Sequence, residues 1–190
     1  MSFSTYFDLR LRPDLEVPDW DRLGRLVRIV HVAGAQTATP FAIAFPDYMR
    51  EGFTLGQRLR VFTQKVQGAE ALYDGIERVP MAVDLAEGSR VRRAPQDAAG
   101  FEAYLMHRLP SGPSKAGAIA PEVKRELQAQ ARLRRLAQQQ ALPFLRMRSS
   151  TGHGFKLVIE RIRAAASDKG LPNGYGLSRQ TQIVALPVQD

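Results

Sequence analysis

The order of strand and helix patterns in the first half of the sequence limits what this chain can fold into more than any other feature. Residues 6–12 alternate apolar and polar side chains, which is the pattern of a half-buried strand. Apolar residues then recur at helical spacing from Trp20 to Val30, and Pro18 and Gly34 stand where they favour the two ends of a helix. The following segments predict a strand, a strand, a short helix and a strand, over residues 40–46, 57–62, 68–77 and 81–85. This βαββαβ order is that of ferredoxin-like domains, which include RNA-recognition domains.

The charge of the chain is distributed unequally between its two halves. Residues 1–98 hold 13 Lys+Arg and 13 Asp+Glu, whereas residues 99–190 hold 14 and 6, so the formal charge of +8 belongs to the second half. The polar run 90–97, which contains a proline, coincides with this change and predicts a domain boundary there. We therefore expect an α+β protein with a ferredoxin-like domain over 1–98 and a smaller basic α+β domain over 99–190. A surplus of cations in one half indicates a polyanionic partner.

The second half predicts a strand at 101–109, a flexible stretch at 110–115, a helix that begins near residue 121, and strands at 144–148 and 155–162. Four cationic side chains of that helix project within an arc of about 100°, with Arg134 just outside it. They are Lys124, Arg125, Arg132 and Arg135. A charged helix face is as often a solvated surface as a binding surface. The charge surplus of the same half and the arginines of the neighbouring strands favour phosphate contacts.

Composition also excludes several classes of protein. The chain has no cysteine, and its 3 histidines show no metal-ligand spacing, so we expect neither a disulfide nor a metal or other cofactor. An apolar run of about 18 residues and a secretory leader are both missing, which predicts a cytoplasmic protein away from the membrane. His31, in the last turn of the first predicted helix, is interpreted either as a residue that caps the helix C-terminus or as a catalytic base.

Two loops carry polar groups that suit nucleic-acid chemistry. Residues 148–155 (RSSTGHGF) place hydroxyls and glycines between two basic strands, where a backbone can approach a phosphate closely. An ordinary hydroxyl-rich hairpin turn has the same composition. Residues 173–178 (NGYGLS) hold Tyr175 between two glycines, as a turn does, or as a segment that presents a phenol to a partner.

Taken together, these segments resemble the CRISPR-associated endoribonucleases that cut the precursor transcript within each repeat, most closely those of subtype I-F systems. The resemblance spans nearly the whole chain, although residues 63–141 match only in general character. It rests on His31 and on the order and spacing of short segments, namely 6–14 (YFDLRLRPD), 44–47 (AFPD), 55–60 (LGQRLR), 142–144 (LPF), 148–155 and 175–178 (YGLS).

The resemblance implies a ferredoxin-like first domain and a second domain whose arginine-rich helix binds a hairpin of the CRISPR repeat RNA. Such enzymes cut at the 3′ base of the stem without a metal, and they then stay on the mature crRNA as part of an interference complex with other subunits. The ribose 2′-OH attacks the adjacent phosphate and leaves a 2′,3′-cyclic phosphate and a 5′-OH. This reaction suits one imidazole and a few hydroxyls in a basic cleft.

The resemblance also assigns catalytic roles. His31 matches the histidine that activates the 2′-OH, and Tyr175 matches the tyrosine that orients it. The family pattern Arg-Ser-x-Ser-Thr-Gly is one residue longer than the segment of this chain, so either Ser149 or Arg148 takes the place of the catalytic serine. We favour Ser149, with Ser150 as a phosphate or ribose contact.

The remaining assignments concern RNA binding. Phe155 matches the aromatic residue that stacks beneath the last base pair of the stem, and Arg108 matches an arginine that reads bases in the major groove. Pro110 stands where the family has a glutamine, which predicts a different cognate stem. The predicted phosphate contacts are Lys124, Arg125, Arg132, Arg134, Arg135 and Arg148. Two alternatives stay open, a non-catalytic hairpin-binding scaffold of the same complex and an unrelated two-domain RNA-recognition protein.

Overall fold

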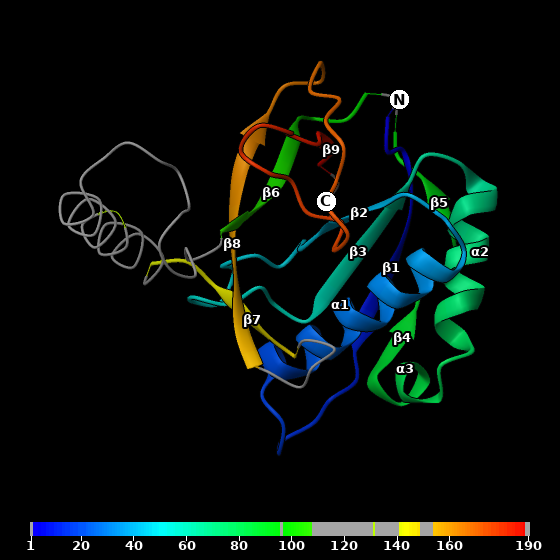
Figure 1. Cartoon of the computed structure of the whole chain (residues 1–190), viewed down its shortest axis with the longest axis vertical. Coiled ribbons are helices and arrows are strands. Elements are labelled where there is room, and N and C mark those ends of the chain that lie inside the picture. Colours follow the sequence, from blue (N-terminus) through cyan, green and yellow to red (C-terminus); the bar gives the residue numbers. More distant parts are fainter. Residues whose placement is uncertain (1, 96, 108–130, 132–140, 149–153, 189–190) are drawn as a thin grey trace, which may run out of the picture.

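The computed structural model is an α+β structure with two antiparallel sheets (Figure 1). It describes residues 2–95, 97–107, 131, 141–148 and 154–188. Among the described residues, the helices include none that is both long enough and apolar enough to cross a membrane.

The first sheet comes from the N-terminal half of the chain. Its strand order is β2-β3-β1-β4, and β5 also pairs with β1. Helices α1 and α2 contact each other and the strands of this sheet. This arrangement is consistent with the ferredoxin-like order expected from the sequence. The elements are β1 (Thr5–Leu11), α1 (Asp19–Gln36), β2 (Phe41–Ala44), β3 (Arg58–Thr63), α2 (Val66–Glu77), α3 (Pro80–Leu85), β4 (Ala86–Gly88) and β5 (Arg92–Arg93).

The predicted alternation of the first strand is confirmed in β1. Phe7, Leu9 and Leu11 are buried in the core, while Arg10 between them is exposed. The strands predicted at 40–46 and 57–62 and the helix predicted at 68–77 are confirmed as β2, β3 and α2.

The strand predicted at 81–85 is wrong, because these residues form the helix α3 and the sheet strand β4 follows at Ala86–Gly88. Pro80 occupies the first turn of α3, where its fixed φ suits a helix and its missing N–H costs nothing. A short apolar run does not distinguish a strand from a helix by periodicity, so the proline was the informative residue.

The second sheet contains the strands of the C-terminal half, in the order β7-β8-β6-β9. The strand predictions for 101–109, 144–148 and 155–162 are confirmed over the described residues, and β8 is longer than predicted. The helix predicted from residue 121 lies outside the described residues, apart from Ala131, which is helical. The strands are β6 (Phe101–His107), β7 (Phe144–Arg148), β8 (Gly154–Ala164) and β9 (Leu186–Pro187).

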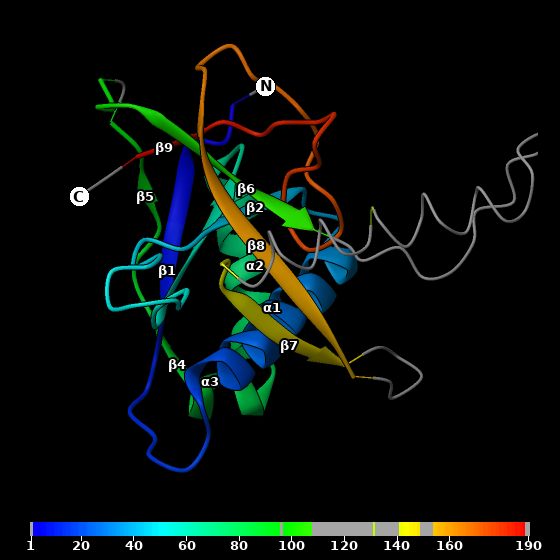
Figure 2. The same cartoon turned by 90° about the vertical axis from the view of Figure 1, so that its left-hand side faces the viewer.

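The two sheets share buried side chains. Leu145 and Met147 of β7 belong to the same buried cluster as Leu23 and Val27 of α1. Figures 1 and 2 show β7 next to α1, and the two elements are in contact. A Cβ on Gly24 would lie 2.2 Å from the Arg146 carbonyl oxygen, so the helix can approach the strand this closely only because residue 24 has no side chain.

Candidate active site

His31 lies in the interior of α1, so the prediction that it stands in the last turn is wrong. The helix continues through Gly34 to Gln36, and its last turn contains no basic residue. Gly34 lies inside the helix, and its missing side chain makes room for the ring of Phe41. A Cβ there would lie 2.5 Å from the Phe41 ring. The interpretation of His31 as a C-terminal cap is therefore excluded.

The half-buried ring of His31 contacts the C-terminal loop of the chain. Its Nδ1 lies 2.5 Å from the backbone carbonyl oxygen of Gly174, across 143 positions of sequence. A carbonyl oxygen can only accept a hydrogen bond, so Nδ1 must carry the proton that it donates. The neutral imidazole then has its lone pair on Nε2. His31 is thus held in the tautomer that can accept a proton through Nε2.

The loop that supplies Gly174 is fixed by its own hydrogen bonds. The buried Asn173 side chain accepts hydrogen bonds from the backbone N–H groups of Tyr175 (2.8 Å) and Leu177 (3.2 Å). Gly176 has a φ of 78°, which favours glycine, and its carbonyl accepts a hydrogen bond from the Ile43 N–H of β2 (2.9 Å). The loop therefore joins the edge of the first sheet and is held in place against α1.

Tyr175 packs against the histidine with its ring. The two ring centroids are 4.8 Å apart, and the planes are tilted by 38°. His31 donates its hydrogen bond to the carbonyl of Gly174, the residue before the tyrosine, and not to the phenol. The structure thus brings together His31 and Tyr175, as the sequence predicted, and adds Gly174, which the sequence did not single out.

Arg148 and Phe155 lie at the same end of the β7–β8 pair. Arg148 is aligned with Gly154, and Met147 is aligned with Phe155. Arg148 is exposed, and 37% of Phe155 is exposed. The other predicted residues lie outside the described residues, namely Arg108, Lys124, Arg125, Arg132, Arg134, Arg135, Ser149 and Ser150.

The described end of β7 faces the same helix that carries His31. Arg148 lines a groove with Arg28 of α1, and His31 follows Arg28 by three residues, which is close to one helical turn. His107 has a different environment, because its Nε2 lies 2.7 Å from the Glu160 carboxylate. The predicted phosphate contact thus lies next to the helix that carries the predicted base, whereas His107 is hydrogen-bonded to Glu160.

The model of a family described as CRISPR-associated protein (Cas_Csy4) matches residues 6–188 of this chain. The chain belongs to this family. A curated Csy4-family relative from Pseudomonas aeruginosa (strain UCBPP-PA14), named CRISPR-associated endonuclease Cas6/Csy4, is 28% identical over 191 residues. That alignment covers 92% of this chain and 95% of the relative. The resemblance to CRISPR-associated endoribonucleases of the subtype I-F kind, drawn from the sequence, is confirmed.

Sequence reasoning missed several residues that shape this Csy4-family site. Gly24 was not singled out, although a glycine inside a helical pattern often marks a close approach of another backbone. Asn173 and Gly174 form an Asn-Gly pair, which is a turn signal, but the sequence does not show what the turn touches. Arg28 has no sequence signal beyond its charge, and Arg146 is one of the strand arginines that the sequence already associates with phosphate contacts.

Proposed function

We propose that the protein is a metal-independent endoribonuclease that binds the hairpin of a CRISPR repeat RNA and cuts at the 3′ base of its stem. The observation that supports it most strongly is the hydrogen bond between His31 Nδ1 and the Gly174 carbonyl (2.5 Å), because it leaves Nε2 free to accept a proton. Membership of the Csy4 family supplies the substrate class.

The proposed reaction uses the RNA as its own nucleophile. His31 Nε2 takes the proton of the ribose 2′-OH, and the 2′ oxygen forms a bond to the adjacent phosphorus. The bond from phosphorus to the 5′ oxygen breaks, and that oxygen leaves as a 5′-OH after it gains a proton. The products are a 2′,3′-cyclic phosphate and a 5′-OH end.

The other residues of the proposal position the RNA. Tyr175 holds the His31 ring through packing, and Ser149 positions the ribose, with Ser150 beside it. Arg148 offsets the negative charge that develops on the phosphate, since a cation near that charge stabilises the transition state. Phe155 stacks on the last base pair of the stem, a contact of about 1–3 kcal/mol.

The domain roles complete the proposal. A ferredoxin-like domain over 1–98 carries the base, and the domain over 99–190 binds the hairpin through Arg108 and through Lys124, Arg125, Arg132, Arg134 and Arg135. The protein then stays on the mature crRNA within the interference complex, in the cytoplasm.

Incubation of the repeat hairpin with the protein in EDTA tests the proposal. We expect cleavage that His31→Ala abolishes, and no cleavage when the 2′-OH at the cut site is replaced by hydrogen, with binding nearly unchanged. Cleavage of the deoxy substrate would show that water is the nucleophile. Tight binding without any cleavage of the ribose substrate would instead support the scaffold alternative.

A further inference from the structure

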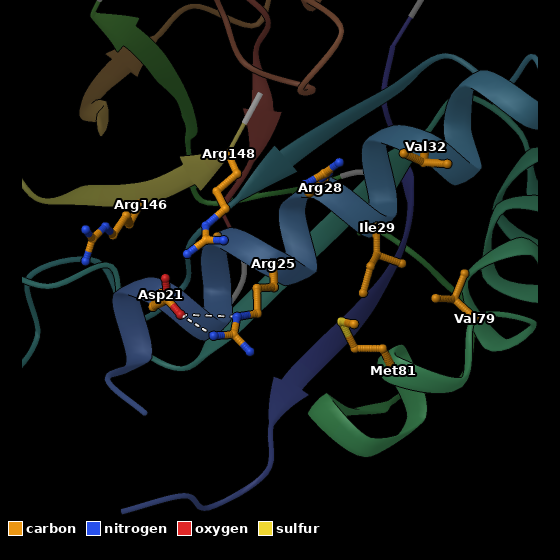
Figure 3. A pocket seen from close by; sticks show the side chains of 10 residues that line it. Asp21, Arg25, Arg28, Ile29, Val32, Val79, Met81, Arg146 and Arg148 are labelled. Atoms are coloured by element: carbon orange, nitrogen blue, oxygen red, sulfur yellow. Dashed lines mark hydrogen bonds and ion pairs between the residues drawn. The ribbon is translucent and has the colours of Figure 1, made fainter. Parts of the chain in front are cut away.

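A groove of about 540 Å³ lies where α1, β7 and the segment around α3 meet, and we call it the α1–β7 groove (Figure 3). One part of its lining is cationic and another part is apolar. The cationic residues are Arg25, Arg28, Arg146 and Arg148, and the apolar ones are Ile29, Val32, Val79 and Met81. Val32 and Met81 are exposed although they are apolar, at 42% and 57%.

The positive charge of the groove is mostly unbalanced by the protein. The acidic residue of the lining, Asp21, is hydrogen-bonded to Arg25 at 2.6 and 3.1 Å. Within the described part of the chain, Arg28, Arg146 and Arg148 form no ion pair with a carboxylate. In Figure 3, Arg148 extends from β7 toward α1. Three cations that line one groove without carboxylate partners raise its positive potential, so the lining suits a polyanion.

The backbone sets the position of these cations. Side chains alternate along β7, so Leu145 and Met147 enter the core while Arg146 and Arg148 stay exposed. Gly24 lets α1 lie against the Arg146 carbonyl, which brings Arg28, one turn farther along the helix, beside the strand. Packing of α1 against β7 in the core therefore places the arginines at the groove.

The groove lies along the helix that carries the candidate base, although His31 is not part of its lining. Gly24, Arg28 and His31 follow one another at spacings of four and three residues, so they lie along one side of α1. The groove is lined by Arg28 and by Val32, the neighbour of His31. The distance along α1 from His31 to the nearest arginine of the groove lining, Arg28, is therefore about one helical turn.

We propose that the α1–β7 groove binds the single-stranded RNA on the 3′ side of the cut, the segment that ends in the 5′-OH after cleavage. This inference rests on the proposed function. Arg28, Arg146 and Arg148 contact its phosphates, and the apolar wall of Val32 and Met81 receives a base without reading its sequence. The groove holds this leaving strand in line before the cut. A 3′ RNA segment therefore adds affinity for the protein that the hairpin alone does not have.

Binding of flanked and unflanked hairpins to the full-length protein tests this inference. The RNA carries a 2′-deoxy ribose at the cut site, so that it stays intact, and it has no flank, a 3′ flank or a 5′ flank of about six nucleotides. We expect the 3′ flank to tighten Kd by about tenfold at low salt. Two to three new phosphate contacts also steepen the log–log salt slope by roughly 1.4 to 2.1, at about 0.7 per contact.

Variants assign the gain to the groove. Arg28→Ala with Arg146→Ala is expected to remove most of the gain from the 3′ flank, and Met81→Glu is expected to reduce it through repulsion. The matched control Arg50→Ala removes an exposed arginine outside the groove lining and keeps the gain. The corresponding Lys variants, Arg28→Lys with Arg146→Lys, restore part of it. Circular dichroism melts confirm that each variant is folded.

The outcomes separate this inference from the proposed function. A gain that persists in both groove variants, a gain from the 5′ flank alone, or no gain from any flank overturns the inference. Each of these results leaves unaffected the cleavage assay, in which the ribose hairpin carries a single nucleotide on the 3′ side of the cut. Failure of that assay, in turn, overturns the nuclease proposal whether or not a 3′ flank adds affinity.

Discussion

His31 is held by its backbone partner more than by its neighbours in sequence. The Gly174 carbonyl fixes the proton on Nδ1, and the Tyr175 ring limits rotation of the imidazole at 4.8 Å between centroids. Both contacts come from a loop that is itself fixed by the Asn173 side chain. His31 is therefore oriented in the free protein, so under the proposed function RNA binding does not have to supply that ordering.

We expect Gly174→Ala to lower the cleavage rate while the affinity for the hairpin stays the same. A Cβ at residue 174 would lie 3.2 Å from His31 Cε1, so the ring has to shift by a few tenths of an ångström. A small misplacement of a catalytic group costs on the order of tenfold to a hundredfold in rate. Single-turnover cleavage and hairpin binding measure the two effects separately.

The control for that variant is Gly100→Ala, because a Cβ at residue 100 meets nothing within 4 Å. We expect wild-type cleavage from it. Equal rates for Gly174→Ala and Gly100→Ala would show that the loop does not position the base.

We expect Tyr175→Phe to keep most of the cleavage rate and Tyr175→Leu to lose about tenfold or more. The observed contact is made by the ring, and phenylalanine retains the ring but not the hydroxyl. Hairpin affinity, measured with the 2′-deoxy RNA, should be equal in both variants. A loss in Tyr175→Phe as large as in Tyr175→Leu would mean that the phenol hydroxyl acts on the substrate.

The resemblance predicts that His31 and Tyr175 act together, but it does not predict the environment in which they lie. The structure places the rings of these two residues in contact. The contact with Gly174 could not be predicted, because it joins positions 143 residues apart and uses a backbone atom that every residue has. Local patterns carry no information on such a contact.

At the level of the elements, α1 and β7 form the contact that assembles the site. The helix lies against the edge strand of the second sheet, with Gly24 at the Arg146 carbonyl. Trp20, one turn before Gly24, packs on Phe144 of the same strand at 5.9 Å between ring centroids. The contact covers an edge that would otherwise be exposed, and it places β7 beside the helix that carries His31.

We expect Gly24→Ala to destabilise the protein by about 1–3 kcal/mol, the range for overpacking of a well-packed contact. The added Cβ would overlap the backbone of β7, which cannot rotate away as a side chain could. Urea unfolding measures the change. If the variant folds, its cleavage rate should fall as well, because α1 and β7 then separate at the site.

Gly75→Ala is the matched control in α2. A Cβ there would make ordinary contacts, at 3.4 Å to Thr37 and 3.5 Å to Ala33. Alanine in a helix interior is favoured over glycine by about 0.5–1 kcal/mol, so this variant should be as stable as wild type or more stable. Similar destabilisation of both variants would contradict the role of Gly24.

The elements differ in how far the sequence could predict them. The alternation of residues 6–12 identified β1 because one face of that strand is buried and the other is not. The run 81–85 was misassigned because its apolar residues fit either period, and Gly34 was misassigned as a helix end because its packing partner, Phe41, is outside the helix. Periodicity therefore predicts elements with one buried face. It fails where a tertiary contact determines the type of the element or where the element ends.

For the whole molecule, the boundary proposed near residue 98 separates charge more clearly than it separates structure. β5 lies within the run 90–97 and pairs with β1 of the first sheet. Tyr104 of the second half is buried with its hydroxyl 3.1 Å from the Phe45 carbonyl oxygen of the first half, and burial raises the pKa of this phenol. The basic half and the neutral half thus share an interior, although their surfaces differ.

We therefore expect urea unfolding of the full chain to show one cooperative transition. Trp20 is the single tryptophan of the chain, and its fluorescence reports the contact of α1 with Phe144 in the second half, whereas far-UV circular dichroism reports both sheets. Because the buried side chains of both halves form one cluster, loss of this contact should expose the core of each half at once. The two signals should have the same midpoint and the same slope. A fluorescence transition at lower urea than the circular dichroism transition would contradict this, since it would show that the halves separate before they unfold.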